Sequence, residues 1–136
     1  MIITVKELRI GNWVELNGNF CEISGITQTG EILVSAEKTS RFADEVHPIS
    51  LTEDIIKKCG FQKNEEKNYY KLREGFIGFK FMISSKNIII DITQYRETTN
   101  EVMPGSNWKP LNHVLYLHQL QNLYYDIMGR ELEIKF

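Results

Sequence analysis

Short runs of alternating apolar and polar residues fill the first third of the chain. The runs cover residues 13–16, 20–26, 31–35 and 41–47. Asn17 and Gly18 separate the first two runs, and this pair supplies the positive φ angles that a tight hairpin turn needs. Pro48 ends the last run, because proline has no amide to donate to a sheet. Short strands with a turn roughly every 8 to 12 residues are typical of small barrels. We therefore expect an SH3-like β unit over residues 5–48.

After Pro48 the pattern changes to helical spacing. Ser50 followed by Glu53 has the form of a capping box, in which the two side chains bind the free amides of a first helical turn. Apolar residues recur at intervals of four from Leu51 to Cys59 and so share one face of a helix. Gly60 suits the left-handed position that follows a helix. The pattern predicts a short helix that begins at Ser50 and ends at Gly60.

A second group of apolar runs follows and predicts an antiparallel sheet. These runs cover residues 61–63, 69–73, 76–83 and 88–92. The last of them is apolar on both faces, which is typical of a central or helix-covered strand. Residues 93–110 show no clear periodicity, and long connections of this kind are either mobile or used for binding. We expect a loop there.

The pattern between residues 111 and 128 admits two interpretations. Apolar residues recur at helical spacing, whereas residues 113–117 also suit a strand. We favour a strand followed by a helix over residues 119–128 that ends at Gly129. Residues 131–136 then alternate as a final strand.

Together these elements predict an α+β fold, in which the SH3-like unit is followed by an antiparallel sheet with two short helices. The chain of 136 residues lies in the size range of one domain, and its 42% hydrophobic and 11% aromatic residues are typical of a packed protein. We expect one compact chain over residues 1–136 with two subregions, 5–48 and 49–136.

Charge and cysteine usage narrow the setting. The formal net charge is −2, with 8 basic and 11 acidic residues in positions 1–68 and 8 and 7 in positions 69–136. This even distribution disfavours tight, unaided binding to nucleic acid. Cys21 and Cys59 lie far apart in the sequence among apolar neighbours, as buried reduced thiols do. The chain has no apolar run long enough for a membrane span or a secretion signal, so we expect a cytoplasmic protein.

Three blocks of residues resemble those of a known group of proteins. They cover residues 8–14 (LRIGNWV), residues 48–53 with 59–61 (PISLTE and CGF), and residues 116–124 (YLHQLQNLY), with Gly129, Glu131 and Leu132 completing the last. In this order they resemble the short uncharacterised proteins encoded by phages and prophages of gut Bacteroidetes. The resemblance reaches both ends of the chain, although residues 62–110 carry no matching motif. It implies an accessory protein in a bacterial cytoplasm, and it brings no catalytic residue or cofactor.

The residues support no particular catalytic chemistry. His113 and His118 do not converge on one face of a helix or a strand, so we expect no metal site from them. No serine or cysteine stands in a glycine elbow, and no glycine loop precedes a helix with a Lys-Ser or Lys-Thr pair. We therefore assign no catalytic residue, no metal and no cofactor. Asp91, with Glu97 and Glu101 in the loop that follows, is the arrangement on which a metal-dependent hydrolase would rest.

Aromatic residues are the remaining binding candidates. Most of them pack in the core of a chain this short, and we assign Trp13 to the core. Trp108 differs because it lies in the polar 93–110 loop, and Tyr125 falls off the apolar face of the predicted helix. The candidate partner-binding residues are Trp108, Lys109, Arg96, Tyr95 and Tyr125.

Three hypotheses for the function follow. The first is a non-enzymatic accessory protein that binds a protein partner, or a second copy of itself, through the barrel surface or the 93–110 loop. The second is a nucleic-acid-binding accessory protein that uses the SH3-like barrel, with Arg9, Lys38 and Arg41 as basic groups; the charge distribution favours it less. The third is the metal-dependent hydrolase built on Asp91 and the 93–110 loop. No membrane partner is expected.

Overall fold

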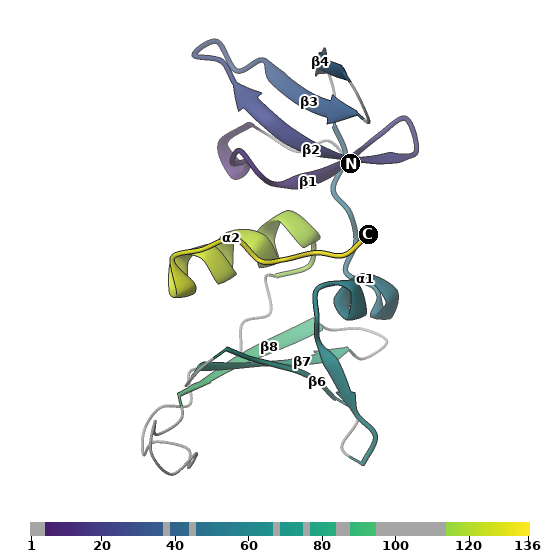
Figure 1. Ribbon diagram of the computed structural model, residues 1–136, viewed down its shortest axis with the longest axis vertical. Coiled ribbons are helices and arrows are strands. Elements are labelled where there is room, and N and C mark those ends of the chain that lie inside the picture. Colours follow the sequence, from purple (N-terminus) through teal and green to yellow (C-terminus); the bar gives the residue numbers. More distant parts are fainter. Residues whose placement is uncertain are drawn as a thin grey trace. The chain divides into compact units, whose positions relative to one another are not determined.

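The computed structural model describes residues 5–36, 39–43, 46–66, 69–74, 77–83, 88–94 and 114–136. Figure 1 shows antiparallel sheets and helices, which confirms the predicted α+β class. The chain divides into two units. Unit 1 comprises Met1–Leu51 and Tyr116–Leu132, and unit 2 comprises Thr52–Leu115 and Glu133–Phe136. The first boundary lies close to the one expected after residue 48, but the C-terminal helix groups with the N-terminal sheet.

Unit 1 contains a four-stranded antiparallel sheet and a helix of three turns. Its elements in chain order are the 3-10 helix η1 (Val5–Glu7), the strands β1 (Trp13–Leu16), β2 (Asn19–Ile26), β3 (Ile32–Ala36) and β4 (Thr39–Ala43), and the helix α2 (Leu117–Met128). The strands are neighbours in the order β1-β2-β3-β4. This order is the meander that the alternating pattern predicts.

The turn between β1 and β2 forms as the sequence indicates. Asn17 and Gly18 have φ angles of 51° and 82°, and Leu16 pairs with Asn19 on either side of them. Two residues with positive φ match the twist of the flanking strands, and glycine adopts this conformation without a steric cost. The predicted hairpin is therefore confirmed.

The chain returns to β1 after β4. The amide of Glu15 donates to the carbonyl of His47 and the amide of His47 donates to the carbonyl of Glu15, both at 2.9 Å. Glu15 is also the register partner of Phe20 on β2, but its amide and carbonyl point away from β2. The bridge to His47 therefore lies on the other edge of β1. Among the described strands β1 and β4 do not pair with each other. The sheet is thus an open meander with one bridge, and a closed SH3-like barrel is not confirmed.

Alternation along the strands builds the core of unit 1. In β2, Cys21 and Ile23 are buried, whereas Glu22 and Ser24 are exposed. Each fully buried aliphatic side chain of this kind contributes about 1.5 to 3 kcal/mol. Trp13 is only half-buried. The buried cluster consists of Leu8, Val14, Leu16, Cys21, Ile23, Ile32, Val34 and Val46.

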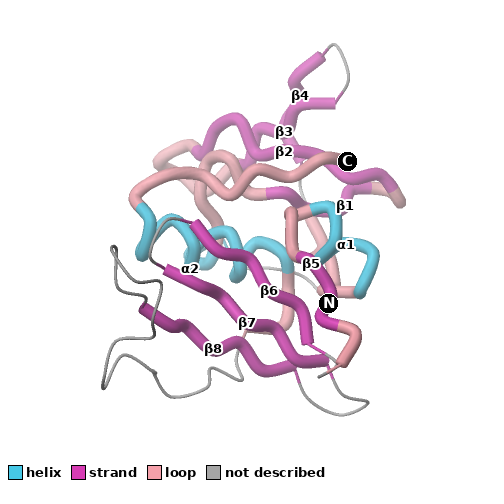
Figure 2. The backbone as a smooth tube through the Cα atoms, turned by 60° about the horizontal axis from the view of Figure 1, so that its bottom comes forward, coloured by secondary structure: helices cyan, strands magenta, loops and turns pink. Residues whose placement is uncertain are grey.

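Unit 2 contains a short helix and a second antiparallel sheet (Figure 2). Its elements are α1 (Glu53–Lys58), β5 (Gln62–Asn64), β6 (Tyr69–Glu74), β7 (Ile77–Ile83) and β8 (Ile88–Gln94). The strands are neighbours in the order β5-β6-β7-β8, so β8 lies at the edge of the described sheet. Of the two alternatives expected for residues 88–92, the central strand is wrong within the described sheet, because apolarity on both faces does not determine how many strands flank a segment. The helix-covered strand stays a prediction.

The register of β6 and β7 brings aromatic residues together on the inner face of this sheet. Tyr70 pairs with Phe81 and Leu72 pairs with Phe79. Phe79 and Phe81 are fully buried. Phe61, directly after α1, packs edge to face against Phe81 with ring centroids 5.9 Å apart, a favoured aromatic geometry. Phe61 therefore belongs to the core of unit 2.

The helix α1 begins later than the sequence suggests. Its N-cap is Thr52, whose hydroxyl accepts a hydrogen bond from the amide of Ile55 at 3.3 Å. Ser50 instead forms a bridge with Tyr116. The capping box of Ser50 and Glu53 is therefore wrong, because the extended backbone at Ser50 is already used in pairing. Gly60 follows the helix with a φ of 92°, as predicted.

The C-terminal region forms a helix but no strand. The amide of Leu117 donates to the carbonyl of Ile49 at 2.8 Å, and α2 begins there rather than at residue 119. The expected strand over residues 113–117 is wrong within its described part, which holds only the bridge at Tyr116. Gly129 ends the helix with a φ of 70°, as predicted. No helix in the described part of the chain is long and apolar enough to cross a membrane.

Residues 131–136 are all described and form no strand. Leu132 is buried, which agrees with the alternating pattern. It pairs with none of the described strands, however, and the amide of Lys135 donates to the carbonyl of Lys58 near the end of α1 at 2.9 Å. A strand needs a paired neighbour as well as alternation, so this prediction is wrong.

Candidate functional site

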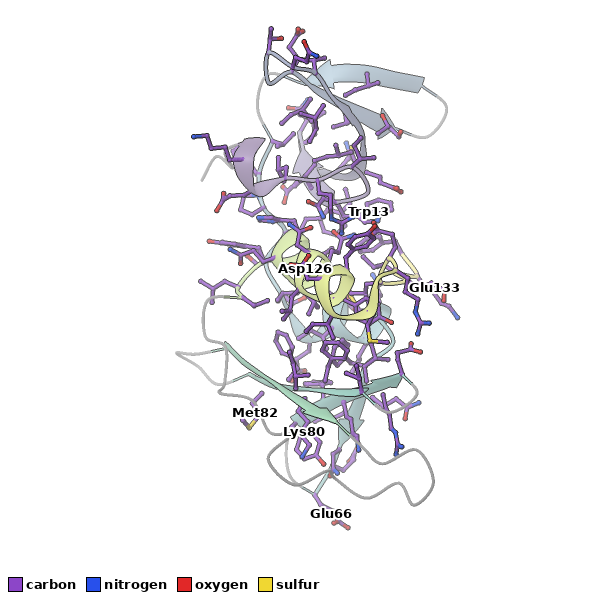
Figure 3. All side chains as sticks on the ribbon, turned by 90° about the vertical axis from the view of Figure 1, so that its left-hand side faces the viewer. Trp13, Glu66, Lys80, Met82, Asp126 and Glu133 are labelled. Carbon is purple, nitrogen blue, oxygen red and sulfur yellow. The ribbon has the colours of Figure 1, made fainter. Side chains whose placement is uncertain are left out.

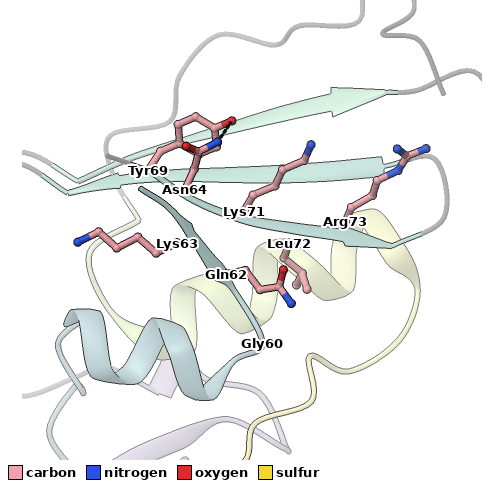
Figure 4. A pocket seen from close by; sticks show the side chains of 8 residues that line it. All are labelled: Gly60, Gln62, Lys63, Asn64, Tyr69, Lys71, Leu72 and Arg73. Atoms are coloured by element: carbon pink, nitrogen blue, oxygen red, sulfur yellow. Dashed lines mark hydrogen bonds between the residues drawn. The ribbon is translucent and has the colours of Figure 1, made fainter. Parts of the chain in front are cut away.

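The outer face of the sheet in unit 2 carries a row of polar and cationic side chains. Side chains alternate between the faces of a strand, and Tyr70 is buried on the inner face of β6. Tyr69, Lys71 and Arg73 therefore share the outer face. Figure 4 shows Lys71 and Arg73 pointing to one side of β6 and Leu72 to the other. Arg73 is exposed and Lys71 is half-buried.

Strand β7 adds a further cation to this face. Lys80 is the register partner of Lys71 on β6, and Figure 3 shows Lys80 on the same side of the sheet as Met82. Like charges directly opposite each other on neighbouring strands are destabilising. Asp91 occupies the corresponding register position on β8.

Tyr69 is held in place at the start of the row. The side-chain amide nitrogen of Asn64 donates to the Tyr69 hydroxyl at 3.1 Å, as Figure 4 shows. The ammonium of Lys80 lies 5.2 Å from the centroid of the Tyr69 ring, within the range of a cation–π contact. The side-chain oxygen of Asn64 also accepts from the amide of Glu66 at 3.0 Å, which stabilises the β5–β6 turn. Two strands and a turn therefore determine the orientation of the ring.

A hollow lies where β5 separates from β6. The two strands pair only from Gln62 with Lys71 to Asn64 with Tyr69, while β6 continues to Glu74. The hollow has a volume of about 430 Å³. Its lining consists of Gly60, Gln62, Lys63, Asn64, Tyr69, Lys71, Leu72 and Arg73. These described lining residues include three cations, two amides and an aromatic ring, and none of them is acidic.

The predicted partner-binding residues fall mostly outside the described part of the chain. Tyr95, Arg96, Trp108 and Lys109 lie there, as do Glu97, Glu101 and Lys38. Tyr125 is described and is 41% exposed. The structure therefore does not bring these candidates together, and the site at the 93–110 loop stays a prediction.

Arg9 was a candidate for contact with nucleic acid, but it is engaged within unit 1. Its guanidinium forms an ion pair with Glu131, and its Nε donates to the side-chain oxygen of Asn122 at 3.1 Å. The guanidinium carbon lies 4.5 Å from the centroid of the Tyr125 ring. Arg9 thus links the N-terminal segment to α2 and packs over the Tyr125 ring. Because its guanidinium is engaged in these contacts, Arg9 is poorly placed to bind a phosphate.

A buried polar network surrounds Arg9. The side-chain oxygen of Asn12 accepts from the amide of Arg9 at 2.7 Å, and its nitrogen donates to Asn122 at 2.9 Å. The side chain of Gln121 accepts from the amide of Trp13 at 2.9 Å and donates to the carbonyl of Gly11 at 3.0 Å. Two of the blocks that carry the family resemblance meet here, so those residues have a clear structural role.

Buried titratable groups offer no reactive centre in the described residues. Cys21 and Cys59 are free and buried, and burial raises the pKa of the Cys59 thiol to about 12. Such a thiol stays protonated and unreactive near neutral pH. His118 is buried at the start of α2, and burial lowers its pKa, an effect that Glu7 partly opposes. Among the described residues no group of three or more His, Cys, Asp and Glu side chains could hold a metal ion.

Comparison with known protein families, with curated proteins and with solved structures finds no match to this chain. The resemblance to phage and prophage proteins stays an expectation from the sequence. The function must be argued from the geometry alone.

The row on β6 and β7 was missed at the sequence level, although one part of it was visible. Tyr69, Lys71 and Arg73 alternate with apolar neighbours in a run that predicts a strand. This pattern places the three side chains on one face of a strand but does not show which strand lies beside them. Lys80 joins them only through the register of β7 with β6, and the hollow depends on where β5 separates from β6.

Proposed function

We propose that the protein is a non-enzymatic nucleic-acid-binding accessory protein that contacts phosphates with the outer face of β6 and β7. The observation that carries this proposal is the row of Tyr69, Lys71 and Arg73 on β6, with Lys80 of β7 opposite Lys71 and over the Tyr69 ring. Proteins that bind single strands combine cations along a groove with aromatic rings on which bases stack. The face has both features.

The charge of the two units supports this surface over the N-terminal sheet. Unit 1 has 5 Lys and Arg residues against 9 Asp and Glu residues, whereas unit 2 has 11 against 9. A second hollow, of about 420 Å³, lies at the β1–β2 turn of unit 1, and its described lining includes Glu15 and no lysine or arginine. Phosphate contacts need clustered cations. The proposal therefore keeps the nucleic-acid hypothesis but moves its surface from the barrel to unit 2.

Binding to a protein partner or to a second copy of the chain is the alternative, through the surface of the N-terminal SH3-like unit or through residues 93–110, which lie outside the described residues. We also propose an SH3-like barrel for unit 1, supported by the bridge from His47 back to Glu15. A bacterial cytoplasmic setting of phage or prophage origin belongs to the same proposal, and it rests on the resemblance of the sequence.

The test is a titration of labelled oligonucleotide at about 50 mM salt, where phosphate contacts are strongest. The double variant Lys71→Gln/Arg73→Gln should bind at least tenfold more weakly than the wild type. Because two phosphate contacts are lost, the slope of log K against log salt should also become shallower by roughly 1.4 to 1.8. Binding is measured by fluorescence anisotropy.

The matched control is Lys6→Gln/Lys57→Gln, which removes the same charge from exposed positions on η1 and α1. It should bind as the wild type does. Absence of binding by the wild type at this salt concentration would refute the proposal, and so would an equal loss in both double variants. Urea unfolding of each variant establishes that the fold is intact.

A further inference from the structure

We infer that the hollow between β5 and β6 receives one unpaired base, so that the protein selects single-stranded over double-stranded nucleic acid. This inference rests on the proposed function, because it assumes that phosphates lie along β6. It adds a specific recognition site for one base within that surface.

The size of the hollow suits one nucleotide rather than a helical groove contact. Pockets that hold small ligands have volumes of about 300 to 1,000 Å³, and this one measures about 430 Å³. It lies beside β6 where β5 turns away, as Figure 4 shows. Gly60 at the end of α1 has no side chain, and a Cβ atom at this position would come within 3.7 Å of Leu72.

The residues that line the hollow include groups that the binding of a phosphate alone does not require. Lys71 and Arg73 alone could bind a phosphate, but the same hollow also contains the side-chain amide of Gln62 and the ring of Tyr69. An amide offers both a donor and an acceptor, which is what the edge of an unpaired base requires. The aromatic ring of Tyr69, on the same face of β6 as Lys71, provides surface for the plane of the base. The combination points to a nucleotide with its base turned out of any stack.

The position of Tyr69 is set before a ligand arrives. Its hydroxyl accepts from Asn64 at 3.1 Å, and Lys80 lies 5.2 Å from its ring centroid. A ring that is already oriented loses little conformational freedom on binding, and this improves affinity. Tyr69 is half-buried, so part of its surface is available at the border of the hollow.

The spacing of the cations fits a strand that runs along β6. Lys71 and Arg73 are two residues apart on one face, a separation of about 7 Å, close to the distance between successive phosphates of an extended single strand. A duplex keeps its bases stacked and paired, and turning one out costs free energy. A duplex can therefore use the cations but not the hollow.

The experiment compares three probes on the intact chain by fluorescence anisotropy at about 50 mM salt. They are labelled (dT)12, a labelled blunt 12-base-pair dA·dT duplex, and inorganic polyphosphate as a competitor. The duplex has twice the charge of the single strand, so charge alone would favour it. We expect (dT)12 to bind at least tenfold more tightly than the duplex, and polyphosphate to compete poorly.

Two substitutions at Tyr69 test the stacking role. Tyr69→Leu should weaken the binding of (dT)12 roughly tenfold and weaken duplex binding much less, whereas Tyr69→Phe keeps the ring and should retain most of the affinity. Gln62→Ala changes an exposed side chain that the fold tolerates. It should reduce binding of (dT)12 a few-fold and have no effect on the duplex.

The outcomes separate this inference from the proposed function. If no probe binds, the proposed function is wrong and the base site falls with it. If the duplex and polyphosphate bind as tightly as (dT)12, or if Gln62→Ala and Tyr69→Leu weaken all probes equally, the phosphate-binding face stands and the base site is wrong. Selective loss of single-strand binding supports both.

Discussion

At the scale of single residues, Gln121 takes the place of a neighbouring strand. Its amide group accepts from the amide of Trp13 and donates to the carbonyl of Gly11, which is the pattern that a paired strand would supply to the edge of β1. Gln121 is only 1% exposed. Buried backbone groups require partners, so this one side chain satisfies two groups that no strand reaches.

We expect Gln121→Met to lower the free energy of unfolding by about 2 to 4 kcal/mol, because two buried backbone groups lose their partners while the side-chain volume is kept. Urea unfolding followed by circular dichroism measures this change. Gln28→Met in the exposed β2–β3 turn is the matched control and should change the free energy of unfolding by less than about 0.5 kcal/mol. Equal effects of the two substitutions would contradict the role of Gln121.

His118 is the second residue whose environment has a measurable consequence. It is 1% exposed, and neither ring nitrogen has a hydrogen-bond partner among the described residues. Its ring stacks on that of Tyr116 at a centroid distance of 6.1 Å. Burial without a partner disfavours the protonated form and lowers the pKa below the ordinary value of 6.5, although Glu7 opposes the shift.

The sign of the pH dependence follows from this lowered pKa. As pH falls below 6.5, the unfolded chain binds a proton at His118 before the folded chain does, so the free energy of unfolding decreases. In His118→Phe, which keeps an aromatic ring beside Tyr116, this part of the decrease should be absent. Urea unfolding between pH 7.5 and pH 5 measures both proteins, and parallel pH profiles would argue against a neutral buried His118.

At the scale of elements, sequence patterns predicted the conformation correctly where it depends on a few neighbouring residues. The hairpin at Asn17 and Gly18 and the glycine that follows each helix formed as predicted. The start of α1 was not decided locally. Both Ser50 and Thr52 are good capping residues, and the pairing of Ser50 with Tyr116 leaves the role to Thr52.

Substitution of the two candidate caps distinguishes them. Thr52→Ala should lower the free energy of unfolding by about 1 kcal/mol, because the amide of Ile55 loses its acceptor. Ser50→Ala should have little effect, since the bridge at Ser50 uses backbone groups. Thermal and urea unfolding of both variants provide the measurement. The reverse order of effects would restore the capping box at Ser50.

At the scale of the whole molecule, the grouping of segments changes the charge argument. Counted along the chain, neither half is clearly basic. Counted by unit, 5 basic and 9 acidic residues lie in unit 1, and 11 and 9 lie in unit 2. The difference is sharper because α2, with Asp126 and Glu131 at its end, groups with the N-terminal sheet. The charge of unit 2 therefore favours an anionic ligand there, which the count along the linear sequence does not indicate.

The candidate site shows the same dependence on tertiary structure. The sequence placed Tyr69, Lys71 and Arg73 on one face of a predicted strand, because side chains alternate with a period of two. It gave no means of adding Lys80 or the hollow beside Gln62. Both depend on the register of neighbouring strands, and a shift of one residue would turn every side chain to the other face.

The sequence by itself determined the α+β class, the four strands of the first meander, the hairpin turn and the C-terminal ends of the two α-helices. These features depend on periodicity and on the backbone preferences of residues such as Gly18 and Gly129, which act over a few neighbours. Only the tertiary structure decided that β8 is an edge strand, that residues 131–136 form no strand, and that Arg9 binds Glu131. Each of these outcomes depends on which distant segment supplies a partner, and local periodicity contains no information about that choice.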